Sequence, residues 1–215
     1  VFVFLVKFLK YFFHRLTFCA ILQKRSKLMN IFIEYLTSIS KLSNSAIHYI
    51  NEYLSVEKIP KKQVFVQELS ASKKLYFIKK GIVRAFFYND GKEITDWFGI
   101  ENMIIGATVR NFPIKNTRHS IETLEDTELV SVSFNDLEKL YQKHHDIERL
   151  GRLIAINTIL FLQHKIDTQQ LFSAKERYDE FVYKYPNLIN RVPLGYIASY
   201  LGMNQVTLSR IRNQY

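Results

Sequence analysis

The chain has 215 residues and a formal net charge of +10, with 47% hydrophobic and 23% charged residues. This composition is ordinary for one large or two small globular domains. The single cysteine, Cys19, excludes a disulfide within the chain, a cysteine-ligated iron–sulfur cluster and a cysteine-rich zinc site. Such cysteine usage is typical of a reducing compartment, so we expect a cytoplasmic protein.

The positive charge is concentrated at the two ends of the chain. Six Lys and Arg residues and no acidic residue lie in residues 1–28, which leaves a net charge of +4 for the rest. Residues 181–215 also lack Asp and Glu but contain four basic residues. A basic terminal unit beside a nearly balanced body favours a nucleic-acid partner, although a mildly basic surface has the same composition.

Residues 1–28 are strongly apolar, but charged residues interrupt them. No run reaches the roughly 18–20 uncharged residues of a membrane-spanning helix. The scattered positive charge also differs from the pattern of a secretory signal. Because Met29 opens an ordinary amphipathic sequence, we interpret residues 1–28 as an upstream extension outside the natural protein, with no membrane partner. The alternative is an interfacial anchor, since Lys and Arg beside Phe and Leu suit a membrane surface.

The next part of the chain changes from helical to strand periodicity. Apolar spacing predicts helices over residues 30–55, with a break at Ser43-Asn44-Ser45. From Ile59 the period is two, and short strands are expected in residues 64–69, 73–99 and 119–134. Asn89-Asp90-Gly91 predicts a tight hairpin, because Asp and Gly tolerate a positive φ. We therefore expect an α+β fold in which residues 29–145 form an antiparallel β-roll with flanking helices.

A long helix is predicted over residues 146–171, after a short one capped by Asn135 or Asp136. Apolar residues at heptad spacing form a seam along the long helix, and further apolar residues widen it. This is more apolar surface than one core-facing side needs. We therefore predict that the helix pairs with a second copy of the chain in a homodimer. A fully buried hairpin helix is the alternative.

Residues 172–215 have the pattern of a helix-turn-helix unit. Ser173 and Glu176 form a capping box, and Pro193 suits the first turn of a helix over 194–201. Gly202 ends that helix, and Asn204 caps the next one. The positions that must pack hold apolar or small residues: Ile197, Ala198, Leu201, Gly202, Met203, Leu208 and Ile211.

The second helix of this unit is expected to expose a polar face. Amide side chains bind adenine edges, Arg binds guanine, and Val or Thr contacts the thymine methyl. Thr207 and Arg212 suit phosphate contacts instead. The candidate DNA-binding residues are Asn204, Gln205, Val206, Thr207, Ser209, Arg210 and Arg212. A helical hairpin packed on the body of the protein is the alternative.

Two stretches carry a family resemblance. KKLYFIKKGIVRAFFYNDGKEITDWF and SAKERYDEFVYKYPNLINRVPLGYIASYLGMNQVTLSRIR resemble the Crp/Fnr transcription regulators from about Phe32 to the end, and the C-terminal stretch is similar to the Bacteroidetes branch. The resemblance implies a cyclic-nucleotide-binding-like β-roll, a homodimer and a palindromic DNA operator. It places the reading positions on Gln205, Val206 and Arg210. RNA polymerase and an unknown small-molecule effector are further candidate partners.

The region of the family's nucleotide pocket departs from the pattern. Nucleotide-binding members carry a Gly-Glu-Leu start and an Arg-Ser/Thr-Ala end, whereas this chain reads FGIENMIIGATVRNFPIKNTRHSIETL. A shift of about one residue would turn Arg118 to the other face of its strand, although Arg110 and Arg118 can still form an anion site. We therefore expect no cyclic nucleotide and no other cofactor. The candidate pocket for an unknown effector comprises Glu101, Asn102, Gly106, Arg110 and Arg118.

Other functions fit the sequence less well. A β-roll metalloenzyme needs clustered His and carboxylate ligands, but His119 is the only histidine of the strand region. The chain has no Gly-x-Ser-x-Gly nucleophile motif and no glycine-rich phosphate loop. We therefore expect neither an enzyme nor a metal site. The remaining alternative is an effector-sensing or scaffold protein whose DNA-binding unit no longer reads DNA.

Overall fold

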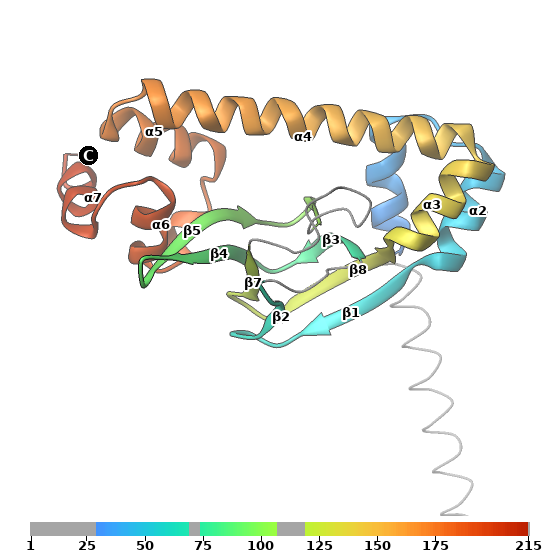
Figure 1. Cartoon of the computed structure of the whole chain (residues 1–215), viewed down its shortest axis with the longest axis horizontal. Coiled ribbons are helices and arrows are strands. Elements are labelled where there is room, and N and C mark those ends of the chain that lie inside the picture. Colours follow the sequence, from blue (N-terminus) through green and yellow to red (C-terminus); the bar gives the residue numbers. More distant parts are fainter. Residues whose placement is uncertain (1–28, 69–73, 107–118, 215) are drawn as a thin grey trace, which may run out of the picture.

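The computed structural model describes residues 29–68, 74–106 and 119–214. The predicted α+β fold is confirmed: two antiparallel sheets form a roll, a long helix runs along one side of it, and short helices cover its two ends (Figure 1). Within the described residues, no helix is both long and apolar enough to cross a membrane. The interpretation of residues 1–28 lies outside the described residues.

Each sheet of the roll contains four strands, and every pairing is antiparallel. One sheet has the order β1-β8-β3-β6 and the other β2-β7-β4-β5. The strands are β1 (Ser55–Ile59), β2 (Val64–Val66), β3 (Lys74–Lys80), β4 (Val83–Asn89), β5 (Lys92–Gly99), β6 (Ile104–Gly106), β7 (Ser120–Thr123) and β8 (Thr127–Ser133).

Alternation along β3 explains why this sheet is apolar on both faces. Tyr76 and Ile78 pack inside the roll against residues of the second sheet. Phe77, one position over, faces the helices on the outside and is fully buried among them. Successive side chains of a strand point to opposite faces, so this one strand joins the interior of the roll to the helical layer.

The turns of the roll follow the predicted glycine positions. Asp90 and Gly91 have φ values of 51° and 74° in the β4–β5 hairpin, which confirms the tight turn. Gly81 has a φ of 101° and connects β3 to β4, which belong to different sheets. A β-carbon on Gly81 would lie 2.5 Å from Thr127 Oγ1 and 2.9 Å from Thr127 Cα. Gly81 thus lets the two sheets join where the backbones approach closely.

The first helices begin at different residues from those expected. The chain is helical over residues 29–39, breaks at residues 40–43 and continues as α2 (Asn44–Tyr53), so the break lies upstream of the predicted position. Helix α3 (Phe134–Lys143) is capped by Ser133, whose hydroxyl accepts from Asp136 N at 3.1 Å. The predicted cap at Asn135 or Asp136 is therefore wrong. Ser133 ends β8 in extended conformation, so the helix can begin immediately after the strand.

The C-terminal helices agree closely with the sequence prediction. They are α4 (His145–Leu171), α5 (Ala174–Lys184), a 3-10 turn η1 (Leu188–Asn190), α6 (Leu194–Tyr200) and α7 (Gln205–Arg212). The capping box at Ser173 and Glu176 is present with both hydrogen bonds. Gly202 has a φ of 65° where α6 ends. Pro193 is the residue just before α6 rather than a member of its first turn.

We expect Gly81→Ala to lower the free energy of unfolding by about 3 kcal/mol, because the new methyl group meets the Thr127 backbone at an unfavourable φ. Gly91→Ala is the matched control: its φ is also positive, but nothing lies within 4 Å of the added carbon. That variant should lose only about 1 kcal/mol. Urea unfolding of both variants measures the difference, and equal losses would show that close approach at Gly81 is unimportant.

Candidate nucleic-acid interface

The α6–α7 pair is a compact helix-turn-helix. Asn204 caps α7, and its side-chain oxygen accepts from Thr207 N at 2.7 Å. Ile197 on α6 and Leu208 on α7 are both fully buried between the helices. Ala198 is also buried, and its small side chain allows the helices to cross closely. Of the predicted packing positions, the structure buries Ile197, Ala198, Leu201, Leu208 and Ile211, whereas Met203 is half-buried and Gly202 is exposed at the turn.

The predicted DNA-binding residues share the accessible side of α7 and the residue that caps it. Val206 is 61% exposed, Thr207 is half-buried, and the other five predicted residues are exposed. The described arginine–carboxylate pairs use Arg84 and Arg191, not Arg210 or Arg212. The surface thus presents amide, hydroxyl and guanidinium groups with no carboxylate between them.

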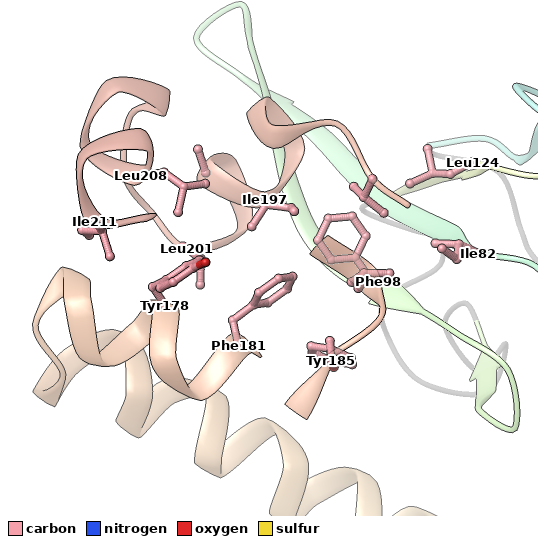
Figure 2. Packing of buried hydrophobic residues seen from close by; sticks show 13 residues of the cluster. Ile82, Phe98, Leu124, Tyr178, Phe181, Tyr185, Ile197, Leu201, Leu208 and Ile211 are labelled. Carbon is pink, nitrogen blue, oxygen red and sulfur yellow. The ribbon is translucent and has the colours of Figure 1, made fainter. Parts of the chain in front are cut away.

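An apolar cluster fixes this helix pair to the roll. Ile82, Phe98 and Leu124 from the roll pack in one cluster with buried side chains of α5, α6 and α7 (Figure 2). The rings of Phe98 and Tyr200 have centroids 5.5 Å apart. Tyr200 is the last residue of α6, so the ring contact ties the first helix of the motif directly to β5.

Arg84 reinforces this contact from the roll side. Its guanidinium is almost fully buried and lies 3.5 Å from the ring centroid of Tyr196 on α6. It also pairs with Glu93 at 2.7 Å and with Glu122 at 2.7 Å through Nε. Beside it, Thr95 N donates to Ser199 Oγ at 2.9 Å. A buried charge needs such partners, so the ring and both carboxylates together make the position of Arg84 tolerable.

Arg191 forms a second polar bridge between the C-terminal helices and the roll. Its Nη2 lies 2.7 Å from Glu101 Oε1 and 2.7 Å from Glu125 Oε2. Burial raises the pKa of Glu101, but hydrogen bonds from Arg191 and from backbone amides outweigh it, and the net pKa is lowered. Hydrogen bonds to Glu125 and Glu101 raise the pKa of Arg191. Arg191 thereby connects two separate turns of the roll.

Asp96 joins β5 to the long helix α4. Lys165 Nζ lies 2.6 Å from Asp96 Oδ1, and His119 Nε2 lies 2.8 Å from Asp96 Oδ2. Burial raises the pKa of Asp96, but hydrogen bonds from His119 and Lys165 have the larger combined effect and lower it to about 2. The carboxylate is therefore ionised in all but strongly acidic solution.

The predicted effector residues are only partly placed together. Glu101 is paired with Arg191, and Asn102 occupies a turn with a φ of 65°. Gly106 ends β6 and lines a cavity whose lining includes neither Glu101 nor Asn102. Arg110 and Arg118 lie outside the described residues. Among the described residues, no group of His, Cys, Asp and Glu can hold a metal ion.

Sequence reasoning missed the residues that position the helix pair. Arg84, Arg191 and Asp96 carry no local motif. Their partners are separated by long stretches of chain: Arg191 contacts Glu101 across 90 positions. The available signal was that residues 181–215 lack Asp and Glu while the roll contains many carboxylates, and this is too general to identify a particular pair.

Solved structures with the same arrangement share little sequence with this chain. FixK2 from Bradyrhizobium japonicum matches with 18% identity and a TM-score of 0.66, over 75% of this chain and 83% of that one. The c-di-GMP-responsive global regulator CLP from Xanthomonas campestris matches with 14% identity and a TM-score of 0.63, over 80% and 91%. A protein from Eubacterium rectale, assigned to the Crp/Fnr transcriptional regulators, has 15% identity and a TM-score of 0.63, over 80% and 83%.

The chain has the Crp/Fnr fold. No protein-family model and no curated protein matches the sequence. The predicted resemblance is therefore confirmed in its architecture: a cyclic-nucleotide-binding-like roll, a long helix and a C-terminal helix-turn-helix. The narrower resemblance to the Bacteroidetes branch stays a prediction.

We expect Asp96→Asn to lower the free energy of unfolding by about 1–2 kcal/mol at pH 7, because the amide loses the charge that Lys165 and His119 stabilise. The folded pKa lies below the ordinary 3.8, so this stabilisation is complete above that value and is lost as the pH falls towards about 2.

Denaturant unfolding of both proteins at a series of pH values tests this. The difference in the free energy of unfolding between wild type and variant should decrease as the pH falls from 3.8 towards about 2. Asp90→Asn, in the exposed β4–β5 turn, is the control and should be neutral. A gap that stays constant with pH would contradict the electrostatic explanation.

Proposed function

We propose that this protein is a homodimeric transcriptional regulator that reads a palindromic DNA operator through α7. In this proposal residues 29–145 are the sensor unit, 146–171 the dimerisation helix and 172–215 the DNA-binding unit of a cytoplasmic protein. The observation that carries it is the surface of α7, where amide, hydroxyl and guanidinium groups stand exposed on a helix whose other side is fully buried.

The chemistry of this surface fits the major groove. Gln205 can form paired hydrogen bonds with an adenine edge, and Arg210 can do so with guanine. The side-chain oxygen of Asn204 caps α7, so Asn204 can contact DNA through its amide N–H groups. Val206 supplies an exposed apolar contact for a thymine methyl group. Arg212, near the end of α7, suits a phosphate. The absence of acid from residues 181–215 removes the charge that would repel a phosphate backbone.

The rival proposal is a sensor or scaffold whose helix-turn-helix no longer reads DNA. Such a surface would be free to acquire the Glu and Lys residues of an ordinary exposed helix. Instead α7 keeps its polar set, and its arginines stay out of the described arginine–carboxylate pairs. We therefore prefer a DNA reader. An effector in the roll and RNA polymerase at the operator belong to the proposal as further partners.

Selection from a random pool of DNA duplexes with the full chain tests the function directly. A regulator of this kind enriches a two-fold-symmetric site whose half-sites lie about one helical turn apart. Binding to every sequence alike, with an affinity that disappears as salt rises, would contradict sequence readout.

We expect Arg210→Ala to weaken binding to the selected site by about 1–3 kcal/mol and to relax the preference at one base pair of each half-site. Arg149→Ala is the control, since Arg149 is an exposed arginine on α4, far along the chain from α7. Fluorescence anisotropy with the selected and scrambled duplexes measures both variants. Equal losses would mean that only net charge matters.

The proposed dimer rests on the outer side of α4. Along this 27-residue helix only Ile147 and Leu150, in its first turns, are buried in the chain. Large apolar side chains further along are exposed: Ile156, Ile159, Leu160, Leu162, Ile166 and Leu171. So many exposed large apolar side chains on one helix are unusual for a monomer, and in the proposed dimer a second copy of the helix covers this apolar patch with its own.

We expect Leu160→Glu to shift the protein from dimer to monomer, because Leu160 is 62% exposed within this patch and the dimer would bury a carboxylate there without a partner. Tyr183→Glu, a residue 85% exposed on α5, makes the same change of character outside α4 and should leave the mass unchanged. Sedimentation equilibrium measures both. A Leu160→Glu protein with the wild-type mass would place the dimer contact elsewhere.

A further inference from the structure

A large apolar cavity lies among the helical layer, the first turns of α4 and one sheet of the roll. Its volume is about 510 Å³, within the range of roughly 300–1,000 Å³ that is typical of small-molecule sites. Its lining comes from residues 29–39, α2, α3, α4 and strands β3, β6 and β8. It lies on the outer face of the sheet: Leu75 lines it, whereas the next residue, Tyr76, packs inside the roll.

Several side chains that line the cavity are almost fully buried. Phe32, Leu36, Leu54 and Leu140 line it and are each less than 5% exposed. Protein interiors are packed closely, so side chains buried as deeply as these normally touch neighbours on every side. Here they face space, and each loses dispersion contacts on that side. The walls thus favour an occupant that is apolar and matches their shape.

The charge of the lining restricts the chemistry of that occupant. Among the described residues, the lining contains no Lys, Arg or His and one carboxylate, Glu138. The other polar groups are neutral and belong to Asn135, Tyr141 and Thr158. None of these described side chains neutralises an anion, and burying an unpaired anion beside Glu138 is unfavourable. A nucleotide, a phosphate or a carboxylate therefore does not fit, whereas an uncharged apolar molecule does.

Two glycines shape the walls of the cavity. A β-carbon on Gly151 of α4 would lie 2.5 Å from the Tyr141 hydroxyl, so the glycine seats that ring against α4. At Gly106 the nearest side-chain atoms would lie 3.6 Å and 3.7 Å from an added β-carbon, so a side chain there has room to enter the cavity.

We propose that this cavity binds an uncharged apolar small molecule. The site is separate from the turn that holds Glu101 and Asn102. It contacts α4 through Ile154, Ala155 and Ile159, and Ile159 also belongs to the exposed apolar patch of that helix. A bound molecule therefore touches the same turns of α4 that carry the patch. Binding at this site does not depend on the proposed DNA function.

Two fluorescent probes that differ by one charge test the proposal on the full chain. N-phenyl-1-naphthylamine is uncharged, and 8-anilinonaphthalene-1-sulfonate has the same ring system with an added sulfonate. We expect saturable binding of one uncharged probe per chain, with the sulfonate bound at least about tenfold more weakly. No binding of the uncharged probe would overturn the proposal, because the cavity is then filled by another part of the chain or by a second copy. Equal or tighter binding of the sulfonate would overturn the assignment to uncharged ligands.

Variants that fill the cavity locate the probe. Ala155→Phe and, independently, Gly106→Leu should each weaken binding of the uncharged probe about tenfold or more, since both residues line the cavity. Arg149→Phe places the same ring on α4 at an exposed residue outside the lining and should bind like the wild type. Circular dichroism and sedimentation confirm that each variant keeps its fold and mass. Unchanged affinity in both filling variants would place the probe elsewhere and overturn the proposal.

Discussion

The position of the helix-turn-helix depends on one shared apolar cluster at the end of the roll. Phe98 of β5 lies within ring contact of Phe181 on α5 and Tyr200 on α6, with centroids 6.3 Å and 5.5 Å away. Ile82 and Leu124 extend the contact from two turns of the roll. The C-terminal helices are therefore not an independently packed domain joined to the roll by a linker. Their core and the end of the roll exclude water together, so the direction in which α7 faces is set by the strands beneath it.

The polar groups around this cluster act mainly on orientation. Ion pairs that are about one-third exposed, such as Arg191 with Glu101 and Glu125, each contribute little free energy because solvent screens them. Their geometry is nevertheless demanding: a planar guanidinium facing two carboxylates permits few relative positions of the parts it joins. Arg84 differs because it is buried, so a movement that removed Tyr196 or one of its carboxylates would leave its charge less well compensated. The apolar cluster thus supplies most of the attraction between the C-terminal helices and the roll. The two arginines restrict how these parts are oriented relative to each other.

Local chemistry made the elements of this fold predictable. A capping box, a glycine at positive φ and an Asp-Gly turn each act within about five residues, so Ser173, Gly202 and Asp90 were readable in the sequence. The cap of α3 was missed because Ser133 belongs to a strand and a helix at once, and strand periodicity concealed its role as a cap. The α7 surface was predictable for the same local reason, since burial of one face of a short helix determines the other.

Contacts between segments that are far apart in the chain could not be predicted from the sequence. Nothing near Arg191 in the chain indicates Glu101, and nothing in the alternation of β4 distinguishes Arg84 as a buried arginine rather than an exposed one. The cavity was unpredictable for a related reason. A cavity forms where side chains that face inward do not contact one another. Sequence periodicity identifies the side chains that face inward, but not whether they make contact.

The long helix α4 contacts the helical layer, the roll and the helix-turn-helix. Its first turns pack on the helical layer, Lys165 holds β5 through Asp96, and Gln169 donates to the Tyr200 carbonyl oxygen at 3.2 Å beside the helix-turn-helix. The same helix borders the cavity and exposes its apolar patch, and Ile159 belongs to both surfaces. A ligand changes the behaviour of such a molecule only if it binds one arrangement of the helix better than another. The cavity wall and the patch share the turn that contains Ile159, so a shift of that turn alters both surfaces at once. Coupling between the cavity and the patch therefore needs no chain of intermediate residues.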